Sequence, residues 1–142
     1  MPDLTLSDAN AIIAAALRRS AEAEYPPMAV VVVDQAGDIK AAQREDGASM
    51  FRVDVALGKA WGAVAFGVSS RALAGRAEHN PNFFLSLSAT SQGRLLPQAG
   101  AVLIRDQSGG RVLGAVGASG GRGDDDEEIC AFGVTEAGFS VD

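Results

Sequence analysis

The sequence predicts an α+β fold in which an antiparallel sheet is packed with helices, in one domain over residues 1–142. A chain of 142 residues is long enough to bury one core. Its apolar residues recur with helical spacing in some segments and form short β-branched runs in others. The predicted order is helix, strand, strand, helix, helix, strand, strand, helix. This order lacks the repeated strand–helix–strand alternation of a doubly wound parallel sheet.

The first predicted helix runs from Thr5 to Glu24. Its apolar stripe has the spacing of an amphipathic helix and consists of Ala9, Ile12, Ile13, Ala16 and Leu17. Thr5 together with Asp8, or Ser7 alone, can cap the start of the helix. The helix ends before Pro26 and Pro27, because proline cannot continue a helix.

A hairpin is expected next. Met28 to Asp34 is a continuous β-branched run, short enough to be a strand buried on both faces. The sequence Gln35-Ala36-Gly37-Asp38 is typical of a tight turn, and Ile39 to Arg44 is the return strand.

Two helices and an irregular segment fill the middle of the chain. The stretch from Ala48 to Phe66 has helical periodicity. Gly67 ends this helix, and Ser69 or Ser70 can cap a shorter one that runs to about Glu78. From His79 to Gln98 neither period is clean, so an irregular segment is expected there. Long loops in compact domains are often functional.

The last third predicts two strands and a helix. The strands are Ala101 to Arg105 and Arg111 to Ser119. Gly114 and Gly117 weaken the second strand but permit the close approach of another backbone or a ligand. An acidic run over residues 124–128 opens the final helix, which extends to about Ala137, because carboxylates complement the positive end of the helix dipole.

Composition excludes several classes of function. One histidine and one cysteine cannot build a structural zinc site, a di-histidine zinc site or an intrachain disulfide. A net charge of −6 disfavours nucleic-acid and anionic membrane partners. The chain has no apolar run of membrane-spanning length, and its N-terminus lacks the features of a signal peptide. A lone cysteine is typical of a reducing compartment, so we expect a cytoplasmic protein.

A corner of charged residues is the main candidate site. Asp34 and Arg44 close the two strands of the first hairpin, and the helix that follows carries Arg52 and Lys59 on one flank. Such a corner can bind a small carboxylate, for which arginine offers a bidentate fork. The alternative is a structural ion pair between Asp34 or Asp46 and one of these cations.

Other features have plainer interpretations. His79 can act as a general base or as an axial haem ligand, or it can be an ordinary loop residue. Cys130 is expected to be a buried thiol in the last helix. Phe83 and Phe84 can wall a planar ligand or plug the core. The acidic run is expected to be a solvated helix cap, because it lacks the ligand spacing of a calcium loop.

Four segments together resemble the GlcG/HbpS-like family of haem-degrading and haem-binding domains, which includes the C-terminal domain of PduO-type proteins. The segments are AVVVVDQAG at residues 29–37, REDGA at 44–48, ALGKA at 56–60 and VLGAVGASGG at 112–121. They occur in the order of the family and cover nearly the whole chain. The resemblance implies a five-stranded antiparallel sheet similar to profilin-like domains, assembly into homo-oligomers, and haem as a cofactor of some members.

The chain departs from the family pattern at two places. Residues 97–102 read PQAGAV where the family usually has Pro-Gly-Gly-x-Pro-Ile. Haem-binding members tend to have a histidine in the region of the first helix, and residues 5–30 contain none. If haem binds, His79, Tyr25 or Met28 has to serve as its ligand. No other metal site is expected.

We therefore expect a homo-oligomeric protein that binds a small organic ligand, auxiliary to a catabolic pathway. Its ligand is expected between the first hairpin, the helix of Lys59 and the glycine-containing strand, against Asp34, Arg44, Arg52, Lys59, Ser119 and Gly120. One alternative is a small cofactor-independent enzyme for an organic acid or an oxidised aromatic metabolite, with Lys59 or His79 as the acid–base group. Another is an assembly partner of a different enzyme.

Overall fold

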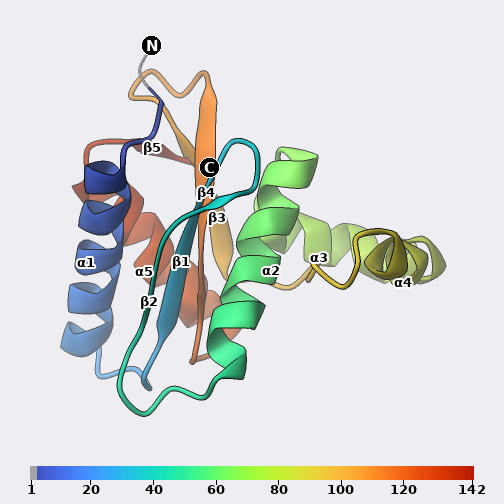
Figure 1. The fold of residues 1–142 in the computed structure, drawn as a ribbon, viewed down its shortest axis with the longest axis horizontal. Helices are drawn as coiled ribbons and strands as arrows, with labels where there is room; N and C mark the ends of the chain where they lie inside the picture. The colour runs from blue at the N-terminus through green and yellow to red at the C-terminus, as the bar shows by residue number, and fades with distance from the viewer. Residues whose placement is uncertain (1–2) are drawn as a thin grey trace.

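The computed structural model describes residues 3–142 and contains one antiparallel sheet of five strands, in the order β2-β1-β4-β3-β5 (Figure 1). Every neighbouring pair is antiparallel. The strands are β1 (Ala29–Asp34), β2 (Ile39–Arg44), β3 (Ala101–Arg105), β4 (Val112–Ser119) and β5 (Ser140–Val141). The predicted fold class is confirmed.

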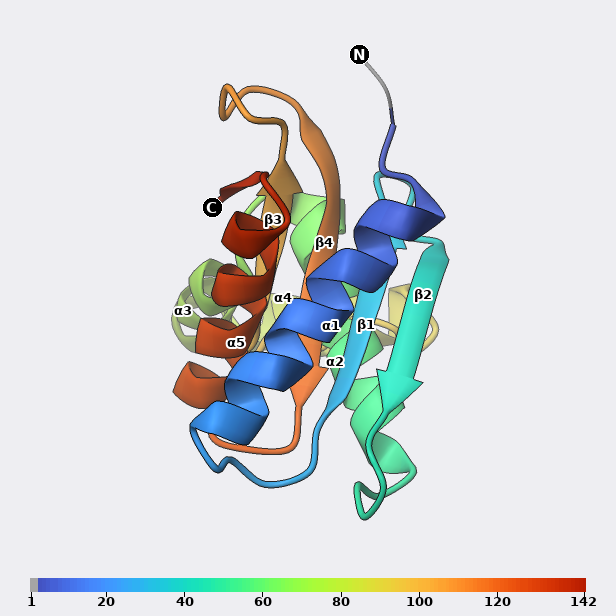
Figure 2. The same ribbon diagram turned by 90° about the vertical axis from the view of Figure 1, so that its left-hand side faces the viewer.

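Helices cover both faces of the sheet. They are α1 (Leu6–Glu22), α2 (Phe51–Phe66), α3 (Ser70–His79), α4 (Pro81–Thr90) and α5 (Gly123–Glu136). Helices α1 and α5 lie side by side on one face and α2 lies on the other (Figures 1 and 2). Helices α3 and α4 extend away from the sheet beyond α2 (Figure 1).

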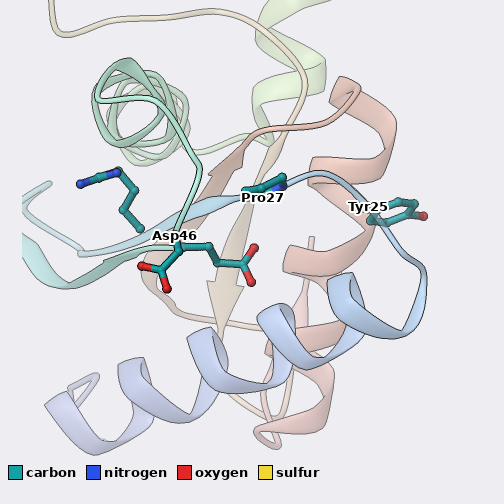
Figure 3. A pocket seen from close by; sticks show the side chains of 5 residues that line it. Tyr25, Pro27 and Asp46 are labelled. Carbon is teal, nitrogen blue, oxygen red and sulfur yellow. The ribbon is translucent and has the colours of Figure 1, made fainter.

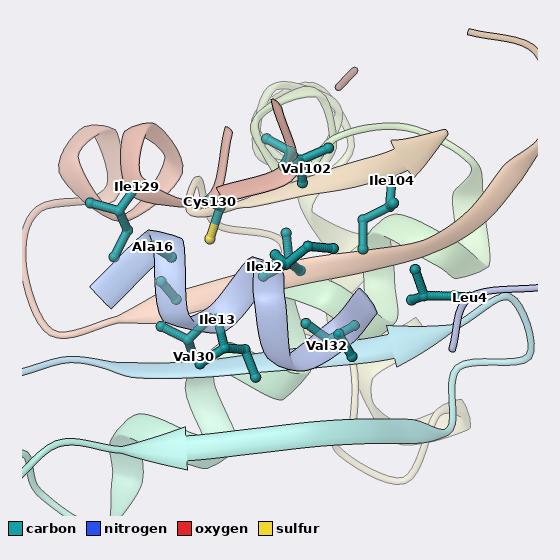
Figure 4. Close-up of a cluster of buried hydrophobic side chains, with 14 of the residues drawn as sticks. Leu4, Ile12, Ile13, Ala16, Val30, Val32, Val102, Ile104, Ile129 and Cys130 are labelled. Atoms are coloured by element: carbon teal, nitrogen blue, oxygen red, sulfur yellow. The ribbon is translucent and has the colours of Figure 1, made fainter. Parts of the chain in front are cut away.

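The face covered by α1 and α5 buries large aliphatic side chains. Ile12 and Ile13 of α1 contact Val30 and Val32 of β1, and Ile129 of α5 completes the layer (Figure 4). The start of α1 is fixed by the predicted capping box, in which the Thr5 hydroxyl accepts from the Asp8 amide and the Asp8 carboxylate accepts from the Thr5 amide. The alternation along β1 sends Val31 and Val33 to the other face.

The face covered by α2 is packed by small residues. A Cβ at Gly117 of β4 would lie 2.4 Å from the carbonyl oxygen of Ala56, so only glycine allows the backbones of α2 and β4 to approach this closely. Ala60 and Ala63 complete the contact from α2. The prediction that the glycine-interrupted strand permits close approach is confirmed, and the approaching element is a helix.

Residues 79–98 were expected to be irregular, but the structure has the helix α4 within this segment. Pro81 lies at the first turn, where its missing N–H costs nothing. Phe84 anchors the helix by packing into a small cluster with Leu73 and Leu95, whereas Phe83 is half exposed. Phe84 therefore fills a small core, which was one of the two predicted roles of Phe83 and Phe84.

The second difference is β5, which follows the last helix. The predicted order has two strands and a helix at the C-terminal end, but Ser140 and Val141 pair with Arg105 and Ile104. A two-residue strand has too little periodicity to be recognised in a sequence. No helix within residues 3–142 is long and apolar enough to cross a membrane.

Candidate functional site

The structure brings Arg44 and Ser119 together at one end of the sheet. In the strand register Ala29 pairs with Arg44 on one side and with Ser119 on the other. Arg52, from the first turn of α2, donates from Nη1 to the Ser119 hydroxyl at 3.3 Å. Three of the predicted site residues thus lie at the same end of the sheet, with β1 between Arg44 and Ser119, and we call this end of the sheet the Ser119 end.

A buried ion pair underlies the Ser119 end. Lys59 of α2 and Asp126 of α5 lie 3.1 Å apart, with side-chain exposures of 6% and 2%. The Lys59 ammonium also donates to the Ala118 carbonyl oxygen at 3.0 Å, and the other Asp126 oxygen accepts from the Gly121 amide at 3.0 Å. The pair therefore fixes residues 118–121 from both sides of the sheet.

Gly100 and Gly120 make room for this arrangement. A Cβ at Gly100 would lie 2.5 Å from the Lys59 Nζ, so a side chain at that position would displace the ammonium group. A Cβ at Gly120 would lie 2.3 Å from the Pro27 carbonyl oxygen. The loop after β4 thus contacts the segment that enters β1, which makes Gly120 a backbone wall of the Ser119 end.

Asp34 lies at the opposite end of the sheet. Its carboxylate accepts from the amides of Ala36 and Asp38 within its own hairpin turn. In the register Asp34 pairs with Gly114, five positions from Ser119 along β4. The structure therefore places Asp34 in a turn, away from the three site residues at the Ser119 end. The ion pair that does form uses Asp126, and neither Asp34 nor Asp46 forms an ion pair in the described part of the chain.

A cavity of about 460 Å³ opens beside the Ser119 end (Figure 3). It is lined by Tyr25, Pro27, Arg44, Glu45 and Asp46. The Arg44 guanidinium donates to the Ala48 carbonyl oxygen at 2.7 Å, and the Glu45 carboxylate accepts from the Met28 amide at 2.8 Å. These two contacts hold the strand-to-helix connection that forms one wall.

Tyr25 closes the other wall of the cavity. Its hydroxyl donates to Glu128 of α5 at 3.2 Å, and Glu128 in turn pairs with Arg19 at 2.9 Å. Partial burial raises the pKa of the Tyr25 phenol, and the carboxylates of Asp125 and Glu128 raise it further. In Figure 3 the hydroxyl points away from Asp46.

The remaining candidates are not among the residues that line the cavity. His79 is exposed at the end of α3, with Nδ1 2.9 Å from the Gly75 carbonyl oxygen. Met28 is fully buried. Cys130 is a buried free thiol 3.6 Å from the Gly100 carbonyl oxygen, and burial raises its pKa. Within residues 3–142 no cluster of three or more histidine, cysteine or acidic residues could hold a metal ion.

Asp126 and Glu128 are not candidate site residues on the sequence alone, which predicts a solvated helix cap over residues 124–128. Asp124 does pair at the surface with Arg71. The spacing between Asp126 and Cys130 could have indicated that Asp126 is buried. Asp126 lies four positions before the core residue Cys130, so a helix places both side chains on the same buried face.

The chain matches one protein-family model, described as haem-degrading protein, HbpS-like, over residues 4–135. No curated protein matches the chain in sequence. The family model thus covers the strands at the Ser119 end, the cavity and the Lys59–Asp126 pair.

Several solved structures share the fold. The crystal structure of Klebsiella pneumoniae protein ORFY has a TM-score of 0.85 and 25% identity, covering 96% of this chain and 92% of that one. The PduOC–haem complex has a TM-score of 0.85 and 25% identity, covering 98% of each chain. A double mutant of Streptomyces reticuli HbpS has a TM-score of 0.81 and 26% identity, covering 95% of this chain and 87% of that one.

Proposed function

Because the chain belongs to the HbpS-like family of haem-degrading proteins, we propose that it is a small-molecule-binding protein that holds a carboxylate-bearing organic ligand in the cavity beside Arg44. The ligand lies between Tyr25 and the connection from β2 to α2. Its carboxylate binds the guanidinium of Arg44. Haem belongs to this ligand class, because it carries two propionate groups.

The open N–H groups of the Arg44 guanidinium are the main support for the proposal. The side chain is exposed and lines the cavity. Within residues 3–142 its guanidinium donates to one carbonyl oxygen, which leaves N–H groups for a ligand. Within residues 3–142 no carboxylate lies within ion-pair distance of it. Glu45 and Asp46 also line the cavity, so the support for a carboxylate ligand is the set of N–H groups that Arg44 leaves open, and not a net positive lining.

Lys59 and Arg52 have supporting roles in this proposal. The Lys59 ammonium is buried and occupied, so it positions the loop that carries Ser119 and does not touch the ligand. Arg52 supplies a second cation at the same end of the sheet. Asp34 has no part in the proposed site, since its carboxylate belongs to the far turn.

Among the residues of the cavity, Arg44 suits a propionate of haem, and none suits the iron. Arg44 can pair with a propionate, but the Tyr25 hydroxyl is occupied by Glu128 and its raised pKa disfavours the phenolate that binds ferric iron. Met28 is enclosed by the core, and His79 is not among the lining residues. We therefore propose recognition of the ligand through its carboxylates and its ring.

Titration with hemin and with metal-free protoporphyrin IX tests this proposal. Both carry the same ring and the same propionates, so we expect saturable binding of both, with dissociation constants within about threefold of each other, since the site offers iron no ligand. Absorbance in the Soret region follows hemin, and porphyrin fluorescence follows the metal-free compound. A failure of both to bind would refute a porphyrin-sized ligand, and binding of hemin alone would refute carboxylate recognition.

A matched pair of variants on β2 locates the site. Arg44→Gln should weaken binding by at least about tenfold, because a charge-assisted hydrogen bond is lost. Lys40→Gln removes a cation from the other end of the same strand and should leave binding unchanged. Equal affinities in the two variants would place the ligand elsewhere.

The proposal includes a homo-oligomer in the cytoplasm. Met50 and Phe51 are 75% and 64% exposed at the start of α2, where a partner copy could cover them, and the lone cysteine suits a reducing compartment. Light scattering coupled to size exclusion should give a mass above that of one chain. Phe51→Glu should lower that mass, whereas a wild-type monomer would remove the oligomer from the proposal.

The enzyme alternative has less support from the geometry. Its acid–base candidates are Lys59, whose ammonium is bound to Asp126 and Ala118, and His79, which does not line the cavity beside Arg44. A general base has to reach the proton that it removes, directly or through one water. We therefore propose binding and not catalysis as the activity of this site.

A further inference from the structure

Trp61 of α2 is the only tryptophan of the chain. It lies between two surface hollows at the end of the sheet opposite the Ser119 end. One hollow, of about 290 Å³, lies against the turn formed by residues 35–37. The other, of about 210 Å³, is bordered by α4 and the segment that follows it. Both are lined by Trp61 and Ala65, and the hairpin turn lies beside the C-terminal end of α2 in Figure 1.

The hollow beside α4 combines apolar walls with one cation. Its walls are Trp61, Phe66, Leu87 and Leu95, and Arg94 lies at its edge. The Arg94 guanidinium carbon is 4.6 Å from the centre of the Trp61 ring, and its Nε donates to the Ser91 carbonyl oxygen at 3.1 Å. A guanidinium over an indole face is held in place by cation–π attraction.

Arg94 lacks the counter-charge that most arginines of this acidic chain have. Within the described residues 3–142, ion pairs occupy Arg18, Arg19, Arg71, Arg105, Arg111 and Arg122. Arg94 is exposed and has no carboxylate within ion-pair distance in that part of the chain. In a protein of net charge −6, an arginine that remains unneutralised beside an aromatic wall is suited to an anionic, planar ligand.

The turn of the first hairpin shapes the opposite side of Trp61. Gly37 has a φ of +85°, and a Cβ at this position would lie 3.0 Å from both Cδ1 and Nε1 of the indole. The turn backbone thus approaches the edge of the indole and restricts the movement of the ring. Trp61 is therefore a fixed wall between the two hollows, which lowers the entropic cost of stacking a ligand on it.

We propose that the hollow between Trp61 and Arg94 is a second binding site, for a single-ring aromatic carboxylate. The ring packs against Leu87, Leu95 and the indole, and the carboxylate binds the guanidinium of Arg94. The volume of about 210 Å³ lies below the range of about 300–1,000 Å³ typical of drug-sized ligands, so the site suits one ring and excludes a porphyrin. It is separate from the cavity beside Arg44, since no residue lines both.

The intrinsic fluorescence of Trp61 reports on this site directly. Titration with benzoate should quench the emission saturably, with a dissociation constant of roughly 1 mM, as suits a ligand of so few atoms. Benzyl alcohol, which keeps the ring without the charge, and acetate, which keeps the charge without the ring, should each bind at least about tenfold more weakly. N-acetyltryptophanamide measures the collisional quenching that has to be subtracted.

Two arginine variants decide the assignment. Arg94→Gln should weaken benzoate binding by at least about tenfold, whereas Arg76→Gln, an exposed arginine of α3 outside the hollow, should leave it unchanged. Thermal melts confirm that both variants are folded, and Trp61→Ala should abolish the heat of benzoate binding in calorimetry. Linear quenching equal to that of the free amide, equal affinities of the two arginine variants, or benzyl alcohol binding as tightly as benzoate would overturn the proposal.

Discussion

The two ends of the central sheet use aspartate in opposite ways. At the Ser119 end, Asp126 of α5 is buried and pairs with Lys59, which lies 67 positions away in the chain. At the other end, Asp34 and Asp106 each bind amides of their own turns, at most five positions away. The aspartate at the Ser119 end joins distant elements through a buried charge pair, whereas the two aspartates at the other end form hydrogen bonds within their own turns.

This difference indicates how the loop that carries Ser119 is held in place. The hydrogen bonds of Asp34 and Asp106 join only residues that are close together in the chain. The Lys59–Asp126 pair joins two helices on opposite faces of the sheet and holds residues 118–121 by hydrogen bonds to Ala118 and Gly121. The loop that carries Ser119 is thereby positioned by elements that are distant in sequence.

The largest expected effect comes from removing one partner of the buried pair. Asp126→Asn should destabilise the protein by about 3–5 kcal/mol, because the Lys59 ammonium stays buried without its counter-charge. Urea unfolding of the variant and the wild type measures the difference.

A double variant separates the loss of a contact from the burial of an unpaired charge. Lys59→Met combined with Asp126→Leu removes both charges and should recover at least half of the stability lost in Asp126→Asn. If Asp126→Asn alone cost less than about 1 kcal/mol, the pair would be no stronger than an exposed one, and the contrast between the two ends would fail.

The second prediction concerns the contribution of Asp106 to stability at low pH. Hydrogen bonds from the Ser108 hydroxyl and the Gly110 amide hold the pKa of Asp106 below its ordinary value. A lowered folded-state pKa gives stability that is present above the unfolded pKa of about 3.9 and is lost as the pH falls through the folded value. Asp106→Asn should therefore flatten the fall in unfolding free energy below about pH 4. An unchanged acid slope in urea titrations would contradict this.

The local end of the molecule could be predicted from the sequence, and the long-range end could only be predicted in part. The turn at residues 35–38 and the capping box of Thr5 and Asp8 follow from neighbouring residues, and both are present in the structure. The sequence does not show that Asp34 and Arg52 lie at opposite ends of the sheet, because the position of Asp34 at the end of a strand does not say which end of the sheet meets Arg52. That answer depends on the register of β1 with β4.

The candidate site shows the same limit. Arg44, Arg52 and Ser119 were named from the sequence and do lie at one end of the sheet, because hairpin and helix follow each other directly. Neither the partner of Lys59 nor the contact of Tyr25 with Glu128 could be predicted, since each joins residues more than 60 positions apart. Periodicity constrains which face a residue occupies, and it carries no information on which distant helix covers that face.

The third prediction concerns the hydrogen bonds that Asp34 accepts within the first hairpin turn. Asp34→Ala removes the acceptor of two amides in a partly exposed turn and should cost about 1–2 kcal/mol. Binding of hemin beside Arg44 should not change, because Asp34 lies at the other end of the sheet. Weakened binding in a folded Asp34→Ala variant would contradict the separation of the two ends.

The smallest expected effect comes from an exposed ion pair that also joins distant residues, and it separates the effect of burial from that of sequence distance. Arg18 of α1 and Glu136 of α5 form an ion pair across 118 positions, but both side chains are more than half exposed. Glu136→Gln should change the unfolding free energy by less than about 0.5 kcal/mol, because solvent screens such pairs and their ordering costs entropy. Unfolding in urea, compared with that of Asp126→Asn, provides the measurement. A loss as large as that of the buried pair would mean that joining distant helices, and not the exclusion of water around the charges, is what stabilises the Ser119 end.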